Sequence, residues 1–217
     1  MTREEVRNRI SEIGIIPAVR VSSEEDALFA AETVAESGIP IVEVTMTVPA
    51  ALKVISTLVK EKGDSVIVGA GTVFDSATAK QCLEAGVGFL TTPGPDLTIV
   101  SFAAAHGTVV FPGAMSPGEV NDMWKAGADF VKIFPCAQVG GPSYIQALKA
   151  PFHKVPLIAS GGVNQDNVVD YIRAGAAAVG IGRHLIHPDA IKRRETGWIR
   201  ELCRRYLTLV RQARNIA

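Results

Sequence analysis

The sequence predicts a (β/α)8 barrel of the TIM type with one helix before its first strand. Short apolar runs recur at a nearly even interval, and each is followed by a longer segment with helical periodicity. The runs are apolar on both faces, as expected of parallel strands that are covered on both sides. The length of 217 residues suits one such barrel, so we expect a single domain over residues 1–217.

The elements can be placed in order along the chain. Eight strands are expected at residues 15–20, 40–45, 66–71, 88–92, 108–113, 129–134, 156–160 and 177–182. The charged segment 1–14 is patterned like a helix, and further helices are expected at 24–37, 49–62, 75–85, 95–105, 116–126, 141–149, 164–174 and 195–213. A doubly wound open sheet is the alternative, but eight compact units close more readily into a barrel.

Glycines support this register of helices and strands. A glycine follows five of the expected helices, where a left-handed backbone would end each helix: Gly38, Gly86, Gly107, Gly127 and Gly175. No linker or low-complexity tract interrupts the series, so no domain boundary is predicted.

Charge and cysteine content limit the possible partners. Twenty-two basic and twenty-two acidic residues cancel, which argues against a nucleic-acid or anionic-membrane partner and for a small molecule. No apolar run is long enough to span a membrane, and no secretion signal precedes the first helix. The three cysteines form no C-x-x-C pair, which fits a reducing cytoplasm.

Lys132 is the strongest candidate for a catalytic residue. It lies near the carboxyl end of an expected strand, where barrel enzymes carry their reacting groups, and large apolar residues flank it on both sides. A buried ammonium without a partner costs several kcal/mol, which favours a neutral, nucleophilic amine. The alternative is a lysine that reaches solvent at the barrel mouth or pairs permanently with Glu43.

Glu43 lies within another apolar strand, in the run IVEVT at residues 41–45. An inward-facing carboxylate is unusual there, and beside an amine it would be able to move protons during carbon–carbon cleavage. The alternative is a buried salt bridge with Lys132 or Arg20.

Two glycine-bearing turns suggest an anion site. The run SGGV at 160–163 follows the seventh strand and is expected to open a helix near Asn164, and Gly182-Arg183 follows the eighth strand. Loops after these two strands form the recurrent phosphate site of the barrel, and arginine grips phosphate through two bonds. The alternatives are plain turn geometry for the glycines and a surface ion pair for Arg183.

Other polar strand ends indicate less. The runs GAGT at 69–72 and TTPG at 91–94 either bind a carboxylate or cap helices. Cys136 is expected to act as an inert small hydrophobic residue. His184 and His187 lack a third ligand at metal-binding spacing, so we expect no metal.

Taken together, these motifs resemble the 2-keto-3-deoxy-6-phosphogluconate and 4-hydroxy-2-oxoglutarate aldolases, a family of class I aldolases. The resemblance covers residues 12–212. It is carried by PAVR (17–20), IVEVT (41–45), VGAGT (68–72), TPG (92–94), FPG (111–113), VKIFP (131–135), GG (140–141) and SGGV (160–163).

The resemblance implies roles for individual residues. Lys132 would be the Schiff-base lysine and Glu43 the general acid and base. Thr72 and Pro93 would wall the pyruvate pocket, with Phe134 beside it. The phosphate end of the substrate would meet Gly161 and Gly162, and Arg20 would line the same mouth. The resemblance also implies a homotrimer and a reaction without metal or organic cofactor.

Two positions depart from the pattern of this family. Thr47 stands where phosphogluconate-type members usually carry an arginine that clamps the substrate carboxylate, and the run TVP at 47–49 is more similar to the galactonate branch. Arg183 stands where a serine is common, and a cation there suits either a phosphate or a carboxylate end.

The expected activity is therefore a carbon–carbon lyase that releases pyruvate and an aldehyde from a small 2-keto acid. One alternative is a phosphosugar isomerase or epimerase, in which Glu43 is the base and Lys132 gives only electrostatic aid. The other is a non-catalytic barrel that binds a sugar acid phosphate.

Overall fold

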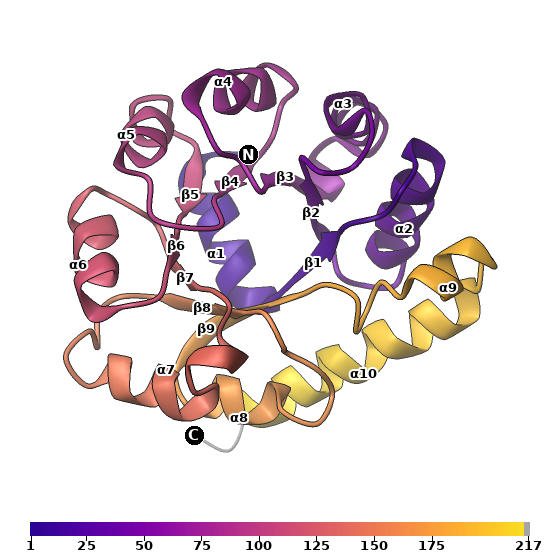
Figure 1. Cartoon of the computed structure of the whole chain (residues 1–217). Coiled ribbons are helices and arrows are strands. Elements are labelled where there is room, and N and C mark those ends of the chain that lie inside the picture. Colours follow the sequence, from indigo (N-terminus) through magenta and orange to yellow (C-terminus); the bar gives the residue numbers. More distant parts are fainter. Residues whose placement is uncertain (215–217) are drawn as a thin grey trace.

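Parallel strands form the centre of the molecule, and helices surround them (Figure 1). The computed structural model describes residues 1–214. Within these residues nine strands hydrogen-bond in the order β5-β4-β3-β2-β1-β9-β8-β7-β6, and the pairings are parallel. Because only Pro112 separates β5 from β6, the two ends of this order meet and the barrel is nearly closed. The predicted barrel is confirmed.

The described elements follow the predicted order closely. The strands are β1 (Ile15–Val19), β2 (Ile41–Thr45), β3 (Ile67–Gly71), β4 (Phe89–Thr91), β5 (Val109–Phe111), β6 (Gly113–Ala114), β7 (Val131–Ile133), β8 (Leu157–Ser160) and β9 (Ala176–Ile181). The helices are α1 (Arg3–Ile13), α2 (Glu24–Glu36), α3 (Ala51–Lys62), η1 (Gly63–Ser65), α4 (Ser76–Glu84), α5 (Leu97–Ala105), α6 (Pro117–Lys125), η2 (Ala137–Val139), α7 (Pro142–Lys149), α8 (Val168–Arg173), α9 (Pro188–Lys192) and α10 (Thr196–Arg214).

The fifth predicted strand is divided in two at Pro112. Proline has no N–H to donate to the sheet, so the ladder is interrupted there. The Pro112 carbonyl still accepts a 2.9 Å bond from the backbone N–H of Lys132. Before the break β5 pairs with β4, and after it β6 pairs with β7. The ninth strand is thus one half of a predicted strand.

Helix boundaries agree with the sequence at most ends. The five glycines expected to end helices have positive φ, from 65° at Gly107 to 101° at Gly175. The helix expected from Asn164 is wrong at its start, because α8 begins at Val168. The Asn164 side chain accepts bonds from the backbone N–H groups of Asp166 and Asn167, at 2.9 and 3.2 Å, and holds a turn there. The short helix α9 was not expected.

Two layers of apolar side chains follow from the alternation of each strand. One layer fills the space between strands and helices, and the other lies inside the barrel. The inner layer includes Ile16, Ile41, Ile67, Phe89, Phe130 and Ile158. Two residues further along each strand the side chain again points inward, and these positions hold Ala18, Glu43, Gly69, Thr91, Lys132 and Ser160. An apolar floor therefore lies directly beneath the polar strand ends.

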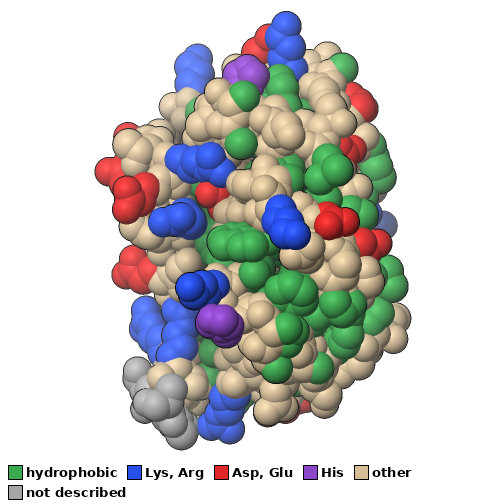
Figure 2. Space-filling model, turned by 90° about the vertical axis from the view of Figure 1, so that its left-hand side faces the viewer, with side chains coloured by type: hydrophobic (Ala, Val, Ile, Leu, Met, Phe, Trp, Pro, Cys, Tyr) green, Lys and Arg blue, Asp and Glu red, His purple; other side chains and the backbone are tan. Residues whose placement is uncertain are grey.

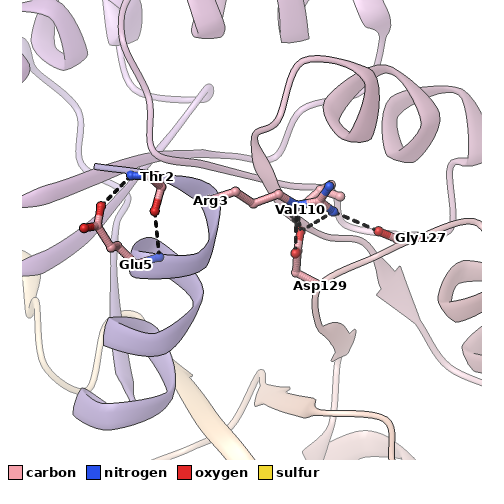
Figure 3. Close-up of polar contacts among 6 residues, drawn as sticks. All are labelled: Thr2, Arg3, Glu5, Val110, Gly127 and Asp129. Carbon is pink, nitrogen blue, oxygen red and sulfur yellow. Dashed lines mark hydrogen bonds and ion pairs between the residues drawn. The ribbon is translucent and has the colours of Figure 1, made fainter.

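Helix α1 covers the opposite end of the barrel. Its Val6 and Ile10 are buried in the inner apolar layer. Arg3 anchors the helix through two nitrogens on the buried carboxylate of Asp129, at 2.9 Å each, and through a 3.1 Å bond to the Gly127 carbonyl (Figure 3). Asp129 also accepts a 2.9 Å bond from the Val110 N–H. The helix is thereby tied to the loop before β7.

The last helix, α10, packs one side on the barrel and exposes the other. Its buried residues recur at helical spacing, and they include Leu202, Tyr206 and Val210. On the outer side Arg204 and Arg205 both bind Glu201. Within residues 1–214, no helix has the length and apolar character needed to cross a membrane.

Candidate active site

A cavity of about 520 Å³ opens where the strands end. The nine residues predicted for the site come from seven different strand ends, and the structure brings all of them to this cavity. They are Arg20, Glu43, Thr72, Pro93, Lys132, Phe134, Gly161, Gly162 and Arg183. The cavity is lined mainly by apolar surface with a few polar groups, as is typical of small-molecule sites.

Lys132 lies on β7 and lines this cavity, and the residue is only 8% exposed. The Lys132 amine lies 3.4 Å from the hydroxyl oxygen of Thr91 and 5.1 Å from the centre of the Phe134 ring. Within residues 1–214 it forms no ion pair. The expected alternatives of a solvent-exposed lysine and a permanent pair with Glu43 are therefore not seen.

Glu43 on β2 points into the same cavity and is 5% exposed. In the part of the chain described, its carboxylate forms no salt bridge with Lys132 or Arg20. Its place depends on Gly71 at the end of β3, because a methyl group at position 71 would overlap Oε1 of Glu43. A buried carboxylate that is not neutralised by a cation is available to move protons.

Thr72 follows β3 with a left-handed backbone, at φ 61°. This conformation is strained for a β-branched residue and is found mainly where function requires it. The backbone on either side is held, since Val73 donates to the Thr91 carbonyl at 3.2 Å and Met46 donates to the Gly71 carbonyl at 2.8 Å. The Thr72 hydroxyl accepts a 3.2 Å bond from the Arg20 guanidinium. One cation and one hydroxyl thus lie together at this end of the cavity.

The glycine loop after β8 forms the other end of the cavity. Gly161 and Gly162 have φ of 87° and 88°. Their packing on the segment after β7 leaves no space for a side chain at 162, where a methyl group would overlap Ala137. The carbonyls of Ser160 and Gly161 accept bonds from the N–H groups of Cys136 and Ala137, at 2.7 and 3.0 Å. The loop is therefore rigid and lies open to the cavity.

Two basic side chains stand beside this loop. Arg183 and His184 are exposed and line the cavity after β9. Within residues 1–214 Arg183 has no ion pair, so the expected surface pair is not seen. In the same part of the chain, the N–H groups of Gly162 and Val163 donate no hydrogen bond. Unused N–H donors and a free guanidinium suit a bound anion.

The family model for the aldolases of 2-keto-3-deoxy-6-phosphogluconate (KDPG) and 4-hydroxy-2-oxoglutarate (KHG) matches residues 6–202. The chain belongs to the KDPG and KHG aldolase family. It is 31% identical to the 2-dehydro-3-deoxy-phosphogluconate aldolase of Treponema pallidum, over 75% of this chain and 77% of that protein. It is also 31% identical to the 2-dehydro-3-deoxy-6-phosphogalactonate aldolase of Escherichia coli, over 81% of this chain and 85% of that protein.

A solved structure in this family contains a covalent reaction intermediate. The KDPG aldolase of Legionella pneumophila, with pyruvate captured as a covalent carbinolamine intermediate, superposes with a TM-score of 0.85. It is 29% identical, and the match covers 91% of this chain and 96% of that one.

This chain departs from the KDPG and KHG aldolase pattern at Thr47, and Thr47 does not line the cavity. Thr47 is exposed, and its hydroxyl lies 2.8 Å from that of Thr45. Because the Thr45 hydroxyl donates to the Val19 carbonyl at 3.0 Å, Thr47 must be the donor in the pair of threonines. Thr47 therefore binds Thr45 at the end of β2, and the cation that contacts Thr72 is Arg20.

Some lining residues of this aldolase-family site were not predicted. Phe74, His184 and Ile186 line the cavity, and Phe74 is 68% exposed. They lie in loops, where no periodicity gives the direction of a side chain. The contact between Thr91 and Lys132 was also not predicted, although the alternation along β4 indicates that the Thr91 side chain points inward. Cys136 is fully buried, and burial raises the pKa of its thiol to about 11, which agrees with the expected inert group.

Proposed function

We propose that this chain is a Schiff-base aldolase that cleaves a six-carbon 2-keto-3-deoxy-6-phospho sugar acid into pyruvate and a phosphorylated aldehyde. One observation carries the proposal. The buried amine of Lys132 lies in a cavity with a carboxylate, Glu43, and is not held in an ion pair within residues 1–214. An amine in that setting is free to bond a carbonyl carbon.

The first half of the reaction forms the electron sink. The Glu43 carboxylate first takes up one proton from Lys132, and the neutral Lys132 nitrogen attacks the C2 ketone and gives a carbinolamine. Loss of water then gives a protonated iminium. Glu43 supplies the proton that the departing hydroxyl needs, and it is left as a carboxylate. Burial of the amine and carboxylate above the apolar floor keeps bulk water away from the iminium.

The second half breaks the bond between C3 and C4. Glu43 accepts the proton of the C4 hydroxyl, and the C4 oxygen forms the aldehyde carbonyl. The electron pair of the broken bond moves through C3 and C2 to the iminium nitrogen and gives an enamine. Glu43 returns the proton to C3, and hydrolysis of the iminium releases pyruvate and restores the amine. Protein groups, the substrate and one water molecule supply every step.

The two ends of the substrate are proposed to meet different cations. Arg20, joined to Thr72, would bind the carboxylate of the pyruvate half. The support for this assignment is that Thr47 is turned away from the cavity and already donates to Thr45. Gly161, Gly162 and Arg183 would bind the phosphate at the far end, while Pro93 and Phe134 would wall the reacting carbons.

A substrate panel tests the proposal. Pyruvate release is measured for the phosphorylated gluconate and galactonate epimers, their unphosphorylated acids and 4-hydroxy-2-oxoglutarate. We expect one or both phosphorylated acids to give the highest kcat/KM, and the comparison of epimers defines the preference at C4. Absence of pyruvate release from every member would contradict the proposal. Interconversion of phosphosugars without pyruvate release would favour the isomerase alternative.

We further propose that three copies of the chain assemble, as the family resemblance implies. Hydrophobic side chains gather on the face formed by α5, α6 and α7 (Figure 2). Large exposed apolar residues on or beside these helices are Leu97, Met115 and Trp124. Met115 is held outward, since its N–H donates to Glu119 at 2.7 Å and its carbonyl accepts from Tyr144 at 2.6 Å. A rigid apolar face of this kind supports contact with a second copy.

Light scattering after size-exclusion chromatography tests this assembly. We expect a trimer for the natural chain and smaller species for the Leu97→Glu and Met115→Glu variants, because a buried unpaired carboxylate is costly in an interface. Lys154→Glu is the control, because Lys154 is exposed. Phe102→Glu would not serve, because the Phe102 ring packs on the core. A monomeric natural chain would contradict the proposal.

We also propose that the chain works in a reducing compartment, the cytoplasm. This proposal is supported by three free and buried cysteines, Cys82, Cys136 and Cys203.

A further inference from the structure

Thr91 is a fully buried threonine at the end of β4, beside the proposed nucleophile. Its hydroxyl oxygen lies 3.4 Å from the Lys132 nitrogen and 2.9 Å from the Phe111 carbonyl oxygen. Within residues 1–214, the Thr91 hydroxyl is the hydrogen-bond partner of the Lys132 side chain. The proposed chemical steps use neither contact.

The direction of the two hydrogen bonds is fixed by chemistry. A carbonyl oxygen can only accept, so the single hydroxyl proton of Thr91 goes to Phe111. The Thr91 oxygen is then left with lone pairs, and it accepts a bond from an N–H of Lys132. The order is therefore Lys132 N–H to Thr91 oxygen, and Thr91 O–H to Phe111 carbonyl.

This order orients the amine. One N–H of Lys132 is held toward β4, which turns the remaining positions of the nitrogen, including the lone pair of the neutral form, toward the cavity. The bond is long at 3.4 Å, as is common for catalytic contacts before substrate binds. The orienting groups come from the barrel wall, since β4 and β5 are paired at Thr91 and Phe111. Rigid strands hold such a contact more closely than loops do.

We propose that Thr91 is a positioning residue for the Schiff base, a role that rests on the proposed aldolase function. In the free enzyme it directs the Lys132 amine at the ketone. After loss of water, the iminium nitrogen keeps one hydrogen, and that N–H donates to the same Thr91 oxygen. The nitrogen therefore stays in one place from amine to iminium to enamine, and the positive charge of the iminium meets an oriented oxygen. No proton passes through Thr91.

The test compares variants that differ by one hydroxyl. Thr91→Val keeps the shape and removes the oxygen, and Thr91→Ser keeps the oxygen. Thr45→Val is the matched control, because Thr45 is also fully buried on a barrel strand and donates to a backbone carbonyl, that of Val19. The rate of imine formation with pyruvate is followed by quenching with borohydride at short times. The melting temperature of each variant is measured alongside.

Loss of one hydrogen bond to a charged or reacting nitrogen is expected to slow imine formation by roughly tenfold or more in Thr91→Val. Thr91→Ser should recover most of the rate, and Thr45→Val should retain it at a similar loss of melting temperature. A purely structural role would affect stability in both valine variants and leave the trapping rate unchanged. Thr91→Ala supplies the same comparison if the valine variant does not fold.

Three results would overturn the proposal: a natural trapping rate in Thr91→Val, no recovery in Thr91→Ser, or an equal loss of rate in Thr45→Val. Failure of the natural chain to form any adduct would instead remove the proposed function itself, so the two failures are distinguishable.

Discussion

The carboxylate of Glu43 occupies the space that a side chain at position 71 would need, so the glycine at the end of β3 determines where the proposed base lies. The Gly71 backbone does not have positive φ, and alanine is therefore allowed there by the main chain. We expect Gly71→Ala to fold and to lower kcat for pyruvate release by about a hundredfold, since a displaced base loses most of its effect.

Steady-state kinetics and circular dichroism check this expectation. Gly197→Ala is the matched control, because a methyl group there would meet no atom within 4 Å. Natural kcat in Gly71→Ala would mean that the position of Glu43 does not limit the reaction.

The strained backbone of Thr72 leads to a prediction in which substrate binding weakens without a loss of stability. Thr72→Gly should leave the free energy of unfolding unchanged or raise it by up to about 1 kcal/mol, because relief of left-handed strain offsets the entropy of a glycine. The same variant should raise KM, since the hydroxyl that meets Arg20 is lost. Urea unfolding and kinetics measure the two effects. A marked loss of stability would show that the Thr72 side chain supports the fold.

The two arginines of the cavity should have separable effects. Arg183→Ala should raise KM for the phosphorylated acid by roughly tenfold to a hundredfold and leave trapping of free pyruvate unchanged, because pyruvate lacks the phosphate end. Arg20→Ala should weaken binding of the phosphorylated acid and also trapping of free pyruvate. Lys154→Ala, which removes an exposed cation outside the cavity, serves as the control. Equal effects of Arg183→Ala on pyruvate and on the full substrate would refute the division of the cavity into two ends.

The contact between Arg3 and Asp129 should matter for stability and not for catalysis. Arg3→Ala leaves the buried carboxylate of Asp129 with only the Val110 N–H among the contacts in Figure 3, so we expect a loss of about 1 to 3 kcal/mol in the free energy of unfolding. Arg7→Ala removes an exposed arginine of the same helix and should cost less than about 0.5 kcal/mol. Urea titration compares the two variants, and equal losses would contradict the anchoring role.

Alternation along the strands explains how much of the site could be predicted from the sequence. Lys132 and Glu43 stand two residues beyond the inward-facing Phe130 and Ile41, so their direction into the barrel follows from the spacing. The start of α8 was missed because the side-chain bonds of Asn164 replace helical turns, and helical periodicity does not reveal such a competing turn.

Loops set the limit of the prediction. Phe74 and His184 follow strands but belong to no periodic segment, so their approach to the cavity depends on turns that the sequence does not fix. The division at Pro112 was foreseeable from the missing N–H of proline. By contrast, the bond between Thr91 and Lys132 joins strands that are not neighbours in the barrel, and spacing within one strand cannot reveal it.

Borohydride trapping in the presence of pyruvate tests the central claim most directly. Peptide mass spectrometry should find one reduced pyruvyl group on Lys132 and complete loss of activity. Lys149 is the internal control: burial lowers the pKa of its amine, but that amine donates to the carbonyls of His153 and Val155 at 2.9 Å each. We predict an adduct on Lys132 and none on Lys149. Unmodified protein under saturating pyruvate, or an adduct at any lysine other than Lys132, would contradict the assignment of Lys132 as the nucleophile.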